Sequence, residues 1–140
     1  MKHTSIQEIM TRQLQTITTN DDVIDAKRIM VENKISHLPV LLDGQLVGII
    51  SKNDIAQVEF LCDFIGEKLD NSTVFKSLSI HELMAKKVES LSSNSTIEDA
   101  ALIFSNSSFQ CLPIIENGKI IGLVTTKDVF RFLSDKKLEA

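Results

Sequence analysis

The two halves of this chain repeat each other. The heptapeptide GIISKND at residues 48–54 returns as GLVTTKD at residues 122–128, so the two copies lie 74 residues apart. At that offset the halves align without a gap over about fifty residues, and most aligned pairs keep their polarity. Such self-similarity indicates that one supersecondary unit has been built twice. We therefore predict two similar units within the 140 residues.

Hydrophobic spacing predicts the same order of elements in both copies. One stretch of each copy has apolar residues at helical spacing, and the next has two apolar runs that flank a turn signal. The predicted order is β-α-β-β-α after a helical turn. In the first copy these elements fall at residues 5–10, 15–18, the stretch after Asp22, residues 37–42, residues 45–50 and the stretch from Asn53, and in the second copy 74 residues later.

Turn residues mark the predicted hairpin of each copy. Asp43-Gly44 and Asn117-Gly118 separate the two longer strands. Asp-Gly and Asn-Gly pairs favour the type I′ turn, which needs a positive φ at both positions. The two copies should therefore turn in the same way.

Cap residues mark the start of the first helix in each copy. Asp21 and Asp22 offer an N-cap carboxylate in the first copy, and Ser95 with Glu98 has the spacing of a capping box in the second. We therefore predict that the second-copy helix begins after Ser95.

The repeat also sets the expected domain organisation. One copy, with three short strands and two helices, is too small to bury both faces of its sheet, whereas two copies packed sheet to sheet can do so. We expect a mixed α/β (α+β) fold with pseudo-twofold symmetry. Its parts should be a first domain at residues 1–60, a helical extension and linker at residues 61–79, and a second domain at residues 80–140.

Composition excludes several partners and compartments. The net charge of −4 argues against nucleic acid, whose phosphates require a basic face. Apolar runs are far shorter than the roughly 20 residues that span a bilayer, so no membrane is expected. The N-terminus lacks the apolar core of a signal peptide, and Cys62 and Cys111 do not form a paired framework. We expect a cytoplasmic protein.

The order of motifs resembles a pair of cystathionine β-synthase (CBS) domains, also called a Bateman module. Each copy has Leu-Pro-Val or Leu-Pro-Ile, then an Asp-Gly or Asn-Gly hairpin, then Gly-x-x-Ser/Thr-x-x-Asp. The resemblance covers residues 6–58 and 80–133, and it implies a sandwich with two clefts for adenosine-containing ligands. It also implies that binding regulates an attached or associated protein and that the pair forms a homodimer.

The resemblance assigns each cleft to residues of both repeats. Cleft A would combine the early strand and pre-proline segment of the first repeat with the aspartate motif of the second: Met10, Gln13, Leu14, Gln15, Ile35, Ser36, His37, Leu38, Thr125, Lys127 and Asp128. Cleft B would combine the corresponding segments in the opposite sense: Met84, Lys87, Val88, Glu89, Phe109, Gln110, Cys111, Leu112, Ser51, Asn53 and Asp54.

The repeated aspartate has chemistry that suits such a ligand. A carboxylate can accept from both ribose hydroxyls through charge-assisted hydrogen bonds, and the hydroxyl residue three positions earlier can contact a phosphate beside the helix N-terminus. Gly48 and Gly122 would leave room for a close backbone approach. The alternative is structural, because Ser/Thr and Asp at this spacing also cap helices. Both interpretations remain open from sequence.

The predicted clefts differ from strong nucleotide sites at the end that would hold the phosphate. Neither pre-proline segment carries arginine; His37 and Cys111 stand there instead, although Lys52, Lys86, Lys87 and Lys127 could compensate. AMP, ADP or S-adenosylmethionine is therefore favoured over ATP. His37 could touch phosphate or simply pack, and Cys111 is expected to be a small core residue.

Aromatic residues bear on the base and on assembly. Phe109 could lie against a purine, whereas cleft A offers only Ile35, so cleft B should hold the base more tightly. Phe60, Phe64 and Phe75 could form core or a dimer face.

No catalytic or metal-binding motif is present in the sequence. Two functions therefore remain: a regulatory adenosyl-ligand sensor acting on a separate protein, and a ligand-free dimeric interaction module. We do not expect an enzyme.

Overall fold

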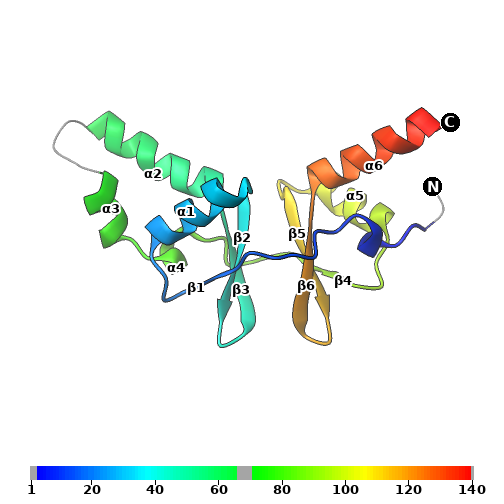
Figure 1. Cartoon of the computed structure of the whole chain (residues 1–140), viewed down its shortest axis with the longest axis horizontal. Coiled ribbons are helices and arrows are strands. Elements are labelled where there is room, and N and C mark those ends of the chain that lie inside the picture. Colours follow the sequence, from blue (N-terminus) through cyan, green and yellow to red (C-terminus); the bar gives the residue numbers. More distant parts are fainter. Residues whose placement is uncertain (1–2, 66–70, 140) are drawn as a thin grey trace. The chain divides into compact units, whose positions relative to one another are not determined.

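The computed structural model describes residues 3–65 and 71–139, which divide into two compact units (Figure 1). One unit, Gln15–Val88, is built on the first repeat and is called the first-repeat unit. The other combines Met1–Leu14 with Glu89–Ala140 and is called the second-repeat unit. The fold is a mixed α+β arrangement with one three-stranded sheet in each unit.

The first-repeat unit has the strand order β1-β2-β3. The first pair is parallel and the second is an antiparallel hairpin. Helix α1 packs against β2, α2 and α3, and Figure 1 shows α1 and α2 on one side of the sheet. The elements are β1 (Ile17–Thr18), α1 (Val23–Asn33), β2 (His37–Leu42), β3 (Gln45–Ser51), α2 (Lys52–Ile65), α3 (Asn71–Ser77) and α4 (Ile80–Leu83).

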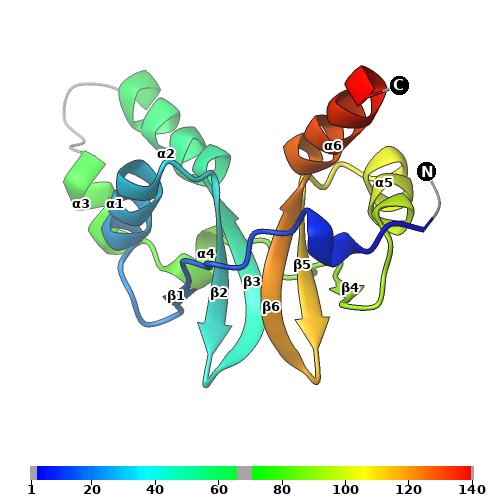
Figure 2. The same cartoon turned by 45° about the vertical axis from the view of Figure 1, so that its right-hand side comes forward.

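The second-repeat unit has the same topology, with the strand order β4-β5-β6, and α5 packs against α6 (Figure 2). Its elements are the 3-10 turn η1 (Ile6–Glu8), β4 (Leu91–Ser92), α5 (Ile97–Asn106), β5 (Cys111–Glu116), β6 (Lys119–Thr125) and α6 (Thr126–Glu139). The predicted order β-α-β-β-α is thus confirmed in both repeats.

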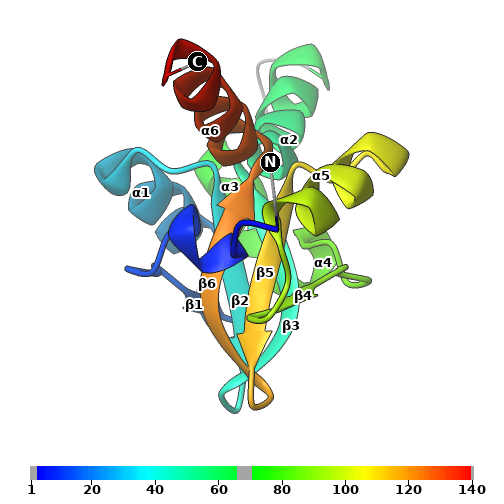
Figure 3. The ribbon, with the colours of Figure 1, turned by 90° about the vertical axis from the view of Figure 1, so that its right-hand side faces the viewer.

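The first segment of each repeat packs on the unit built from the other repeat. Thr11 exchanges backbone hydrogen bonds with Leu123 of β6, at 2.8 and 3.1 Å, and Figure 3 shows this N-terminal segment beside β6. Ala85 makes the equivalent pair with Ile49 of β3, at 2.8 and 3.1 Å. Each compact unit therefore includes a segment taken from outside its own repeat.

The exchanged segments supply core side chains. Ile6 and Met10 belong to the core of the second-repeat unit, and Ile80 and Met84 belong to the core of the first-repeat unit. Neither Ile6 nor Ile80 has any exposed surface. Burying one such side chain contributes about 1.5–3 kcal/mol, so the exchange is a substantial part of what stabilises each unit.

The hairpins turn as predicted. Asp43 and Gly44 have φ angles of 51° and 79°, and Asn117 and Gly118 have 52° and 77°. Positive φ at both positions is the signature of a type I′ turn.

One predicted helix start was wrong by a residue. Helix α5 is capped by Thr96, whose Oγ1 accepts from Asp99 N at 3.2 Å while Asp99 Oδ2 accepts from Thr96 N at 2.9 Å. Ser95 is held elsewhere, because its carbonyl accepts from Ile6 N at 2.9 Å. Both Ser95 and Thr96 have an acidic residue three positions later, so only the exchanged segment decides between them.

The predicted extension and linker, residues 61–79, contains more helix than expected. Helix α2 continues to Ile65, and α3 covers Asn71–Ser77. Gly66 and Asp70, which fall within residues 61–79, are outside the described residues. Phe75 of α3 is 4% exposed and packs in the core, so α3 is held against the first-repeat unit.

Candidate functional site

The repeated motif of the first-repeat unit forms a reciprocal capping box. Ser51 N donates to Asp54 Oδ2 at 2.8 Å, and Asp54 N donates to Ser51 Oγ at 3.1 Å. Ser51 ends β3 and α2 begins at the next residue, so the two side chains close the first turn of the helix. One carboxylate oxygen of Asp54 is thereby committed to structure. The other oxygen, Oδ1, is not used by the box.

The second-repeat unit has the same capping box, and an arginine side chain lies beside its aspartate. Thr125 N donates to Asp128 Oδ2 at 2.9 Å, and Asp128 N donates to Thr125 Oγ1 at 3.3 Å. Asp128 Oδ1 lies 3.7 Å from a guanidinium nitrogen of Arg131, one turn along α6. Arg131 was not predicted from the sequence, although its i, i+3 spacing from the aspartate indicates an ion pair on one helix. Gln57 stands at the corresponding place in the first repeat.

Each pre-proline segment lies against the start of the helix in its own unit. His37 is opposite Ser51 in the hairpin, and Lys52 N donates to Ser36 O at 2.8 Å. Cys111 is likewise opposite Thr125. The structure thus brings together, within one unit, residues that the sequence analysis assigned to different clefts.

Burial sets the protonation of the two pre-proline side chains. Burial lowers the pKa of His37, and the charge of Asp54 partly opposes that change. Burial also raises the pKa of the Cys111 thiol to about 12, and the charge of Asp128 adds to it. Both side chains are therefore neutral at pH 7. Cys111 is a buried thiol, as expected for a small core residue.

Protein atoms of the exchanged segments, not an open space, lie against the two motif glycines. A Cβ at Gly48 would lie 2.6 Å from Met84 Sδ and 2.7 Å from the carbonyl oxygen of Ala85. A Cβ at Gly122 would lie 2.6 Å from Met10 Sδ. The close backbone approach predicted at these glycines is real, but the exchanged segments make it. Met10 and Met84, both predicted site residues, are 7% and 5% exposed.

The other predicted site residues fall in one unit or the other. Those in the first-repeat unit are Gln15, Ile35, Leu38, Asn53, Lys87 and Val88, and those in the second-repeat unit are Gln13, Leu14, Glu89, Phe109, Gln110, Leu112 and Lys127. Leu38 and Leu112 have no exposed surface and belong to the two cores. Clefts A and B combine residues of both units, and their composition stays a prediction.

The three phenylalanines around the predicted linker have different environments. Phe75 is buried, whereas Phe60 and Phe64 of α2 are 68% and 80% exposed. The two exposed rings stack with their centroids 6.4 Å apart. Together with Leu61, which is 53% exposed, they form an apolar surface on α2.

None of the helices in the described part of the chain combines the length and apolar character that crossing a membrane requires.

Comparison with known families agrees with this repeat. The family model for the CBS domain matches residues 6–60 and, a second time, residues 80–135. The chain belongs to the CBS domain family. It is a tandem CBS pair, with one match centred on each repeat.

Relatives of this CBS pair include much longer enzymes. Inosine-5'-monophosphate dehydrogenase of Korarchaeum cryptofilum is 32% identical over 125 residues, which cover 89% of this chain and 23% of that protein. Homoserine O-acetyltransferase of Methanohalobium evestigatum is 29% identical over 137 residues, or 96% of this chain and 25% of that protein. The chain thus spans about a quarter of the length of these relatives.

Solved CBS structures have the same fold. CBSX2 in complex with AMP is 26% identical, with a TM-score of 0.76 over 96% of this chain and 98% of that one. Protein MJ1225 from Methanocaldococcus jannaschii, described as a putative archaeal homolog of γ-AMPK, is 26% identical, with a TM-score of 0.78 over 94% of this chain and 48% of that one. The CBS pair of MJ0100, in complex with 5'-methylthioadenosine and S-adenosyl-L-methionine, shares the fold with a TM-score of 0.78 at 24% identity.

Proposed function

We propose that this CBS pair is a regulatory module that binds an adenosine-containing ligand and acts on a separate partner protein. The observation that supports this most is the matched pair of aspartates at the starts of α2 and α6. Each carboxylate is oriented by a capping box through Oδ2, and its Oδ1 is not used by that box. The complex of the related CBSX2 with AMP gives the proposal its ligand class.

The oriented carboxylate suits a ribose. Backbone N–H groups fix its position before a ligand arrives, so little conformational entropy is lost on binding. An ionised oxygen accepts hydrogen bonds from vicinal hydroxyls with about 1.5–3 kcal/mol each. The helix N-terminus beside it favours negative charge and suits a phosphate. AMP, ADP, ATP and S-adenosylmethionine all carry the ribose that this site would hold.

The capping boxes also favour a second function. Ser51 with Asp54, and Thr125 with Asp128, already satisfy each other and the helix N-termini. A protein that used these residues only as caps would need no ligand. It would then act as a dimeric interaction module through its exposed surfaces.

Calorimetric titration with AMP, ADP, ATP, S-adenosylmethionine and NAD separates the two functions. We expect at least one adenosyl compound to bind, and a micromolar ligand corresponds to roughly −8 kcal/mol. At about a hundredfold above its dissociation constant it should stabilise the fold by roughly 2.7 kcal/mol per site. Asp54→Asn and Asp128→Asn should remove the heat of their sites, because asparagine keeps a cap acceptor but loses the charge.

Asp99 provides a matched control for these variants. It occupies the same third helical position and makes the same reciprocal box with Thr96, yet it belongs to neither predicted cleft. Asp99→Asn should leave ligand affinity unchanged. If all three variants lower thermal stability equally and no compound binds the wild type, the aspartates are caps and the ligand-free function is favoured.

We also propose that the CBS pair forms a homodimer through the apolar surface of α2. Phe60 and Phe64 expose large rings to solvent, and such exposed aromatic clusters are typical of protein contacts. Light scattering of the wild type and of Phe60→Ser/Phe64→Ser tests this directly. A monomeric wild type at micromolar concentration would contradict it.

A further inference from the structure

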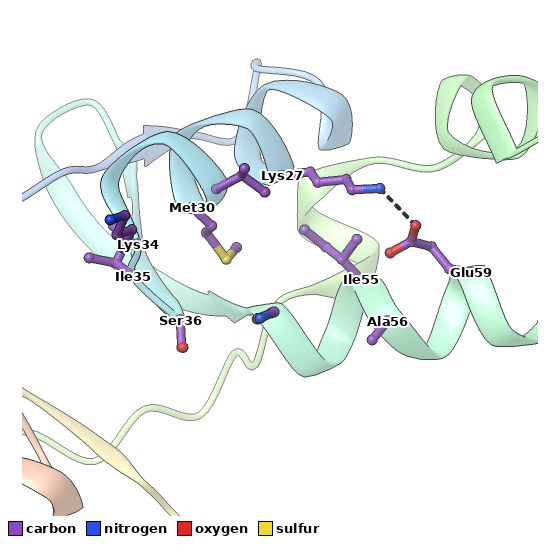
Figure 4. A pocket seen from close by; sticks show the side chains of 10 residues that line it. Lys27, Met30, Lys34, Ile35, Ser36, Ile55, Ala56 and Glu59 are labelled. Carbon is purple, nitrogen blue, oxygen red and sulfur yellow. Dashed lines mark hydrogen bonds and ion pairs between the residues drawn. The ribbon is translucent and has the colours of Figure 1, made fainter.

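A cavity of about 400 Å³ lies between α1 and α2 of the first-repeat unit (Figure 4). Met30 from α1 and Ile55 from α2 point into it, and Ile35 lines the end near β2. Met30 and Ile55 belong to the buried core of this unit. The cavity therefore has an apolar floor and a size that falls within the range of small-molecule sites, about 300–1,000 Å³.

The rim of the cavity is basic. Three lysines and one glutamate line it, in a chain whose net charge is −4. Lys27 Nζ pairs with Glu59 Oε2 at 2.7 Å, so these two charges neutralise each other. Within residues 3–65 and 71–139, no ion pair involves Lys34 or Lys52. Two ammonium groups thus remain available beside an apolar floor.

The backbone places one of these lysines at a cost. Lys34 is the C-cap of α1 and adopts the left-handed conformation, with φ 54° and ψ 44°. Glycine is the unstrained residue at such a position, and a side chain with a Cβ costs roughly 1 kcal/mol. The helix end therefore carries a cation at a place where glycine would fit more easily.

The cavity is separate from the carboxylate of the repeated motif. The cavity residues of α2 are Lys52, Ile55, Ala56 and Glu59, whose spacing of i, i+3, i+4 and i+7 defines one helix face. Asp54 follows Lys52 by two residues and so lies about 200° further round the helix. A ligand in this cavity would not occupy the position beside Asp54. The cavity does share Ile35 and Ser36 with the predicted cleft A, whose aspartate is Asp128.

The second repeat lacks every charge of this cavity. Lys27, Lys34, Lys52 and Glu59 correspond to Ala101, Ser108, Thr126 and Leu133. The floor residues Met30 and Ile35 correspond to the larger Phe104 and Phe109. The basic rim and apolar floor occur together only in the first copy of the repeat, so they are not part of the duplicated framework.

We propose that this cavity is a second binding site, for a small organic anion with an apolar body. Its acidic head, a carboxylate or a phosphate, contacts Lys34 and Lys52. Its apolar body lies on Met30, Ile35 and Ile55. Charge complementarity selects the head, and burial of apolar surface provides most of the affinity.

Methyl NMR on the intact chain with three six-carbon probes tests the site. The probes are hexyl phosphate, hexanoate and the uncharged hexanol. We expect both anions to shift the methyl signals of Met30 and Ile55 and to leave Ile114, in the core of the other unit, unmoved. Hexanol should bind at least about tenfold more weakly, a difference of 1.4 kcal/mol. The relative affinities of the two anions identify the preferred head.

Lysine variants show whether the rim selects the anion. Lys34→Gln/Lys52→Gln should weaken hexyl phosphate about tenfold and leave hexanol unchanged. Lys76→Gln removes an exposed lysine of α3 in the same unit and should have no effect. Asp54→Asn and Asp128→Asn should each leave the binding of hexyl phosphate unchanged, which keeps this result independent of the adenosyl proposal for both predicted clefts. Equal affinity of wild type for hexanol and hexyl phosphate, or an unaffected double variant, would overturn the site.

Discussion

The two units share a framework but differ in the side chains around it. Both have the same strand order, type I′ hairpin, bulged register and capping box after the hairpin, at the start of α2 or α6. Between the helices, however, the first-repeat unit has a basic rim where the second has none. This difference teaches that the duplication preserved what fixes the backbone. The positions that we propose to meet a ligand have diverged.

The same contrast holds near the repeated aspartates. His37 faces Asp54 in the first-repeat unit, whereas Cys111 is at the equivalent place beside Asp128. Asp128 has Arg131 one turn later, and Asp54 has Gln57 there. The two aspartates are therefore equivalent as caps but not as electrostatic sites.

The largest expected effect comes from breaking the exchange of leading segments. Ile6→Ala and Ile80→Ala should each lower the free energy of unfolding by about 2–5 kcal/mol, because both side chains are fully buried. Hydrogen exchange should then show which unit opens. Ile6→Ala should expose amides of β5 and β6, and Ile80→Ala those of β2 and β3.

An exposed isoleucine provides the control for this pair. Ile24 of α1 is 39% exposed, and its replacement by alanine should cost less than about 1 kcal/mol. If Ile6→Ala instead loosened β2 and β3, the N-terminal segment would belong with its own repeat in solution.

A smaller effect should separate the two motif glycines. Gly48→Ala should cost about 1–3 kcal/mol, because the new methyl group would meet a backbone oxygen at 2.7 Å. Gly122→Ala should cost less, since its nearest backbone oxygen, that of Thr11, is 3.1 Å away and the flexible Met10 can move. Urea unfolding of the two variants measures this ranking. Equal costs would mean that the segments pack alike.

The sequence predicted the parts of this fold that depend on local chemistry. Strand β2 and the hairpins at Asp43-Gly44 and Asn117-Gly118 matched their predictions, because turn residues and apolar runs are local signals. The starts of α2 and α6, at Lys52 and Thr126, were each one residue from the prediction.

The features that the sequence did not predict depend on contacts distant in the chain. The exchange of leading segments could not be read from periodicity, and it moved the cap of α5 to Thr96. The cavity between α1 and α2 was also not predicted, because its lysines lie far apart in the sequence. Before the helices pack, these lysines look like ordinary solvent-exposed residues. For the candidate site, the sequence predicted the motif residues. Their assignment to clefts depends on how the two units are placed relative to each other, which local sequence signals do not give.

The protonation of His37 should make the first repeat sensitive to pH. Burial lowers the pKa of His37 below its ordinary value of about 6.5, so the unfolded chain binds a proton more readily than the folded one. Stability should therefore fall as the pH drops from 7 through 6.5. Urea unfolding at pH 7.5 and 5.5 should show a larger loss for wild type than for His37→Asn. His81→Asn, which alters an exposed histidine of the same unit, should retain the wild-type loss; a similar loss in all three would exclude His37 as the cause.

The smallest expected effect concerns the ion pair between Arg131 and Asp128. Arg131 is 71% exposed on its side chain and lies 3.7 Å from Asp128 Oδ1, and exposed pairs of this kind contribute about 0–1 kcal/mol. Arg131→Gln makes this motif resemble the first one, and we expect it to lower the free energy of unfolding by less than about 0.5 kcal/mol. The difference should vanish in about 1 M salt, where charges are screened beyond about 3 Å. Arg28→Gln, which removes comparable exposed pairs on α1, serves as the control. A loss above about 1.5 kcal/mol that persists in salt would show that Arg131 does more than pair at the surface, and that the two aspartates differ as caps as well as in charge.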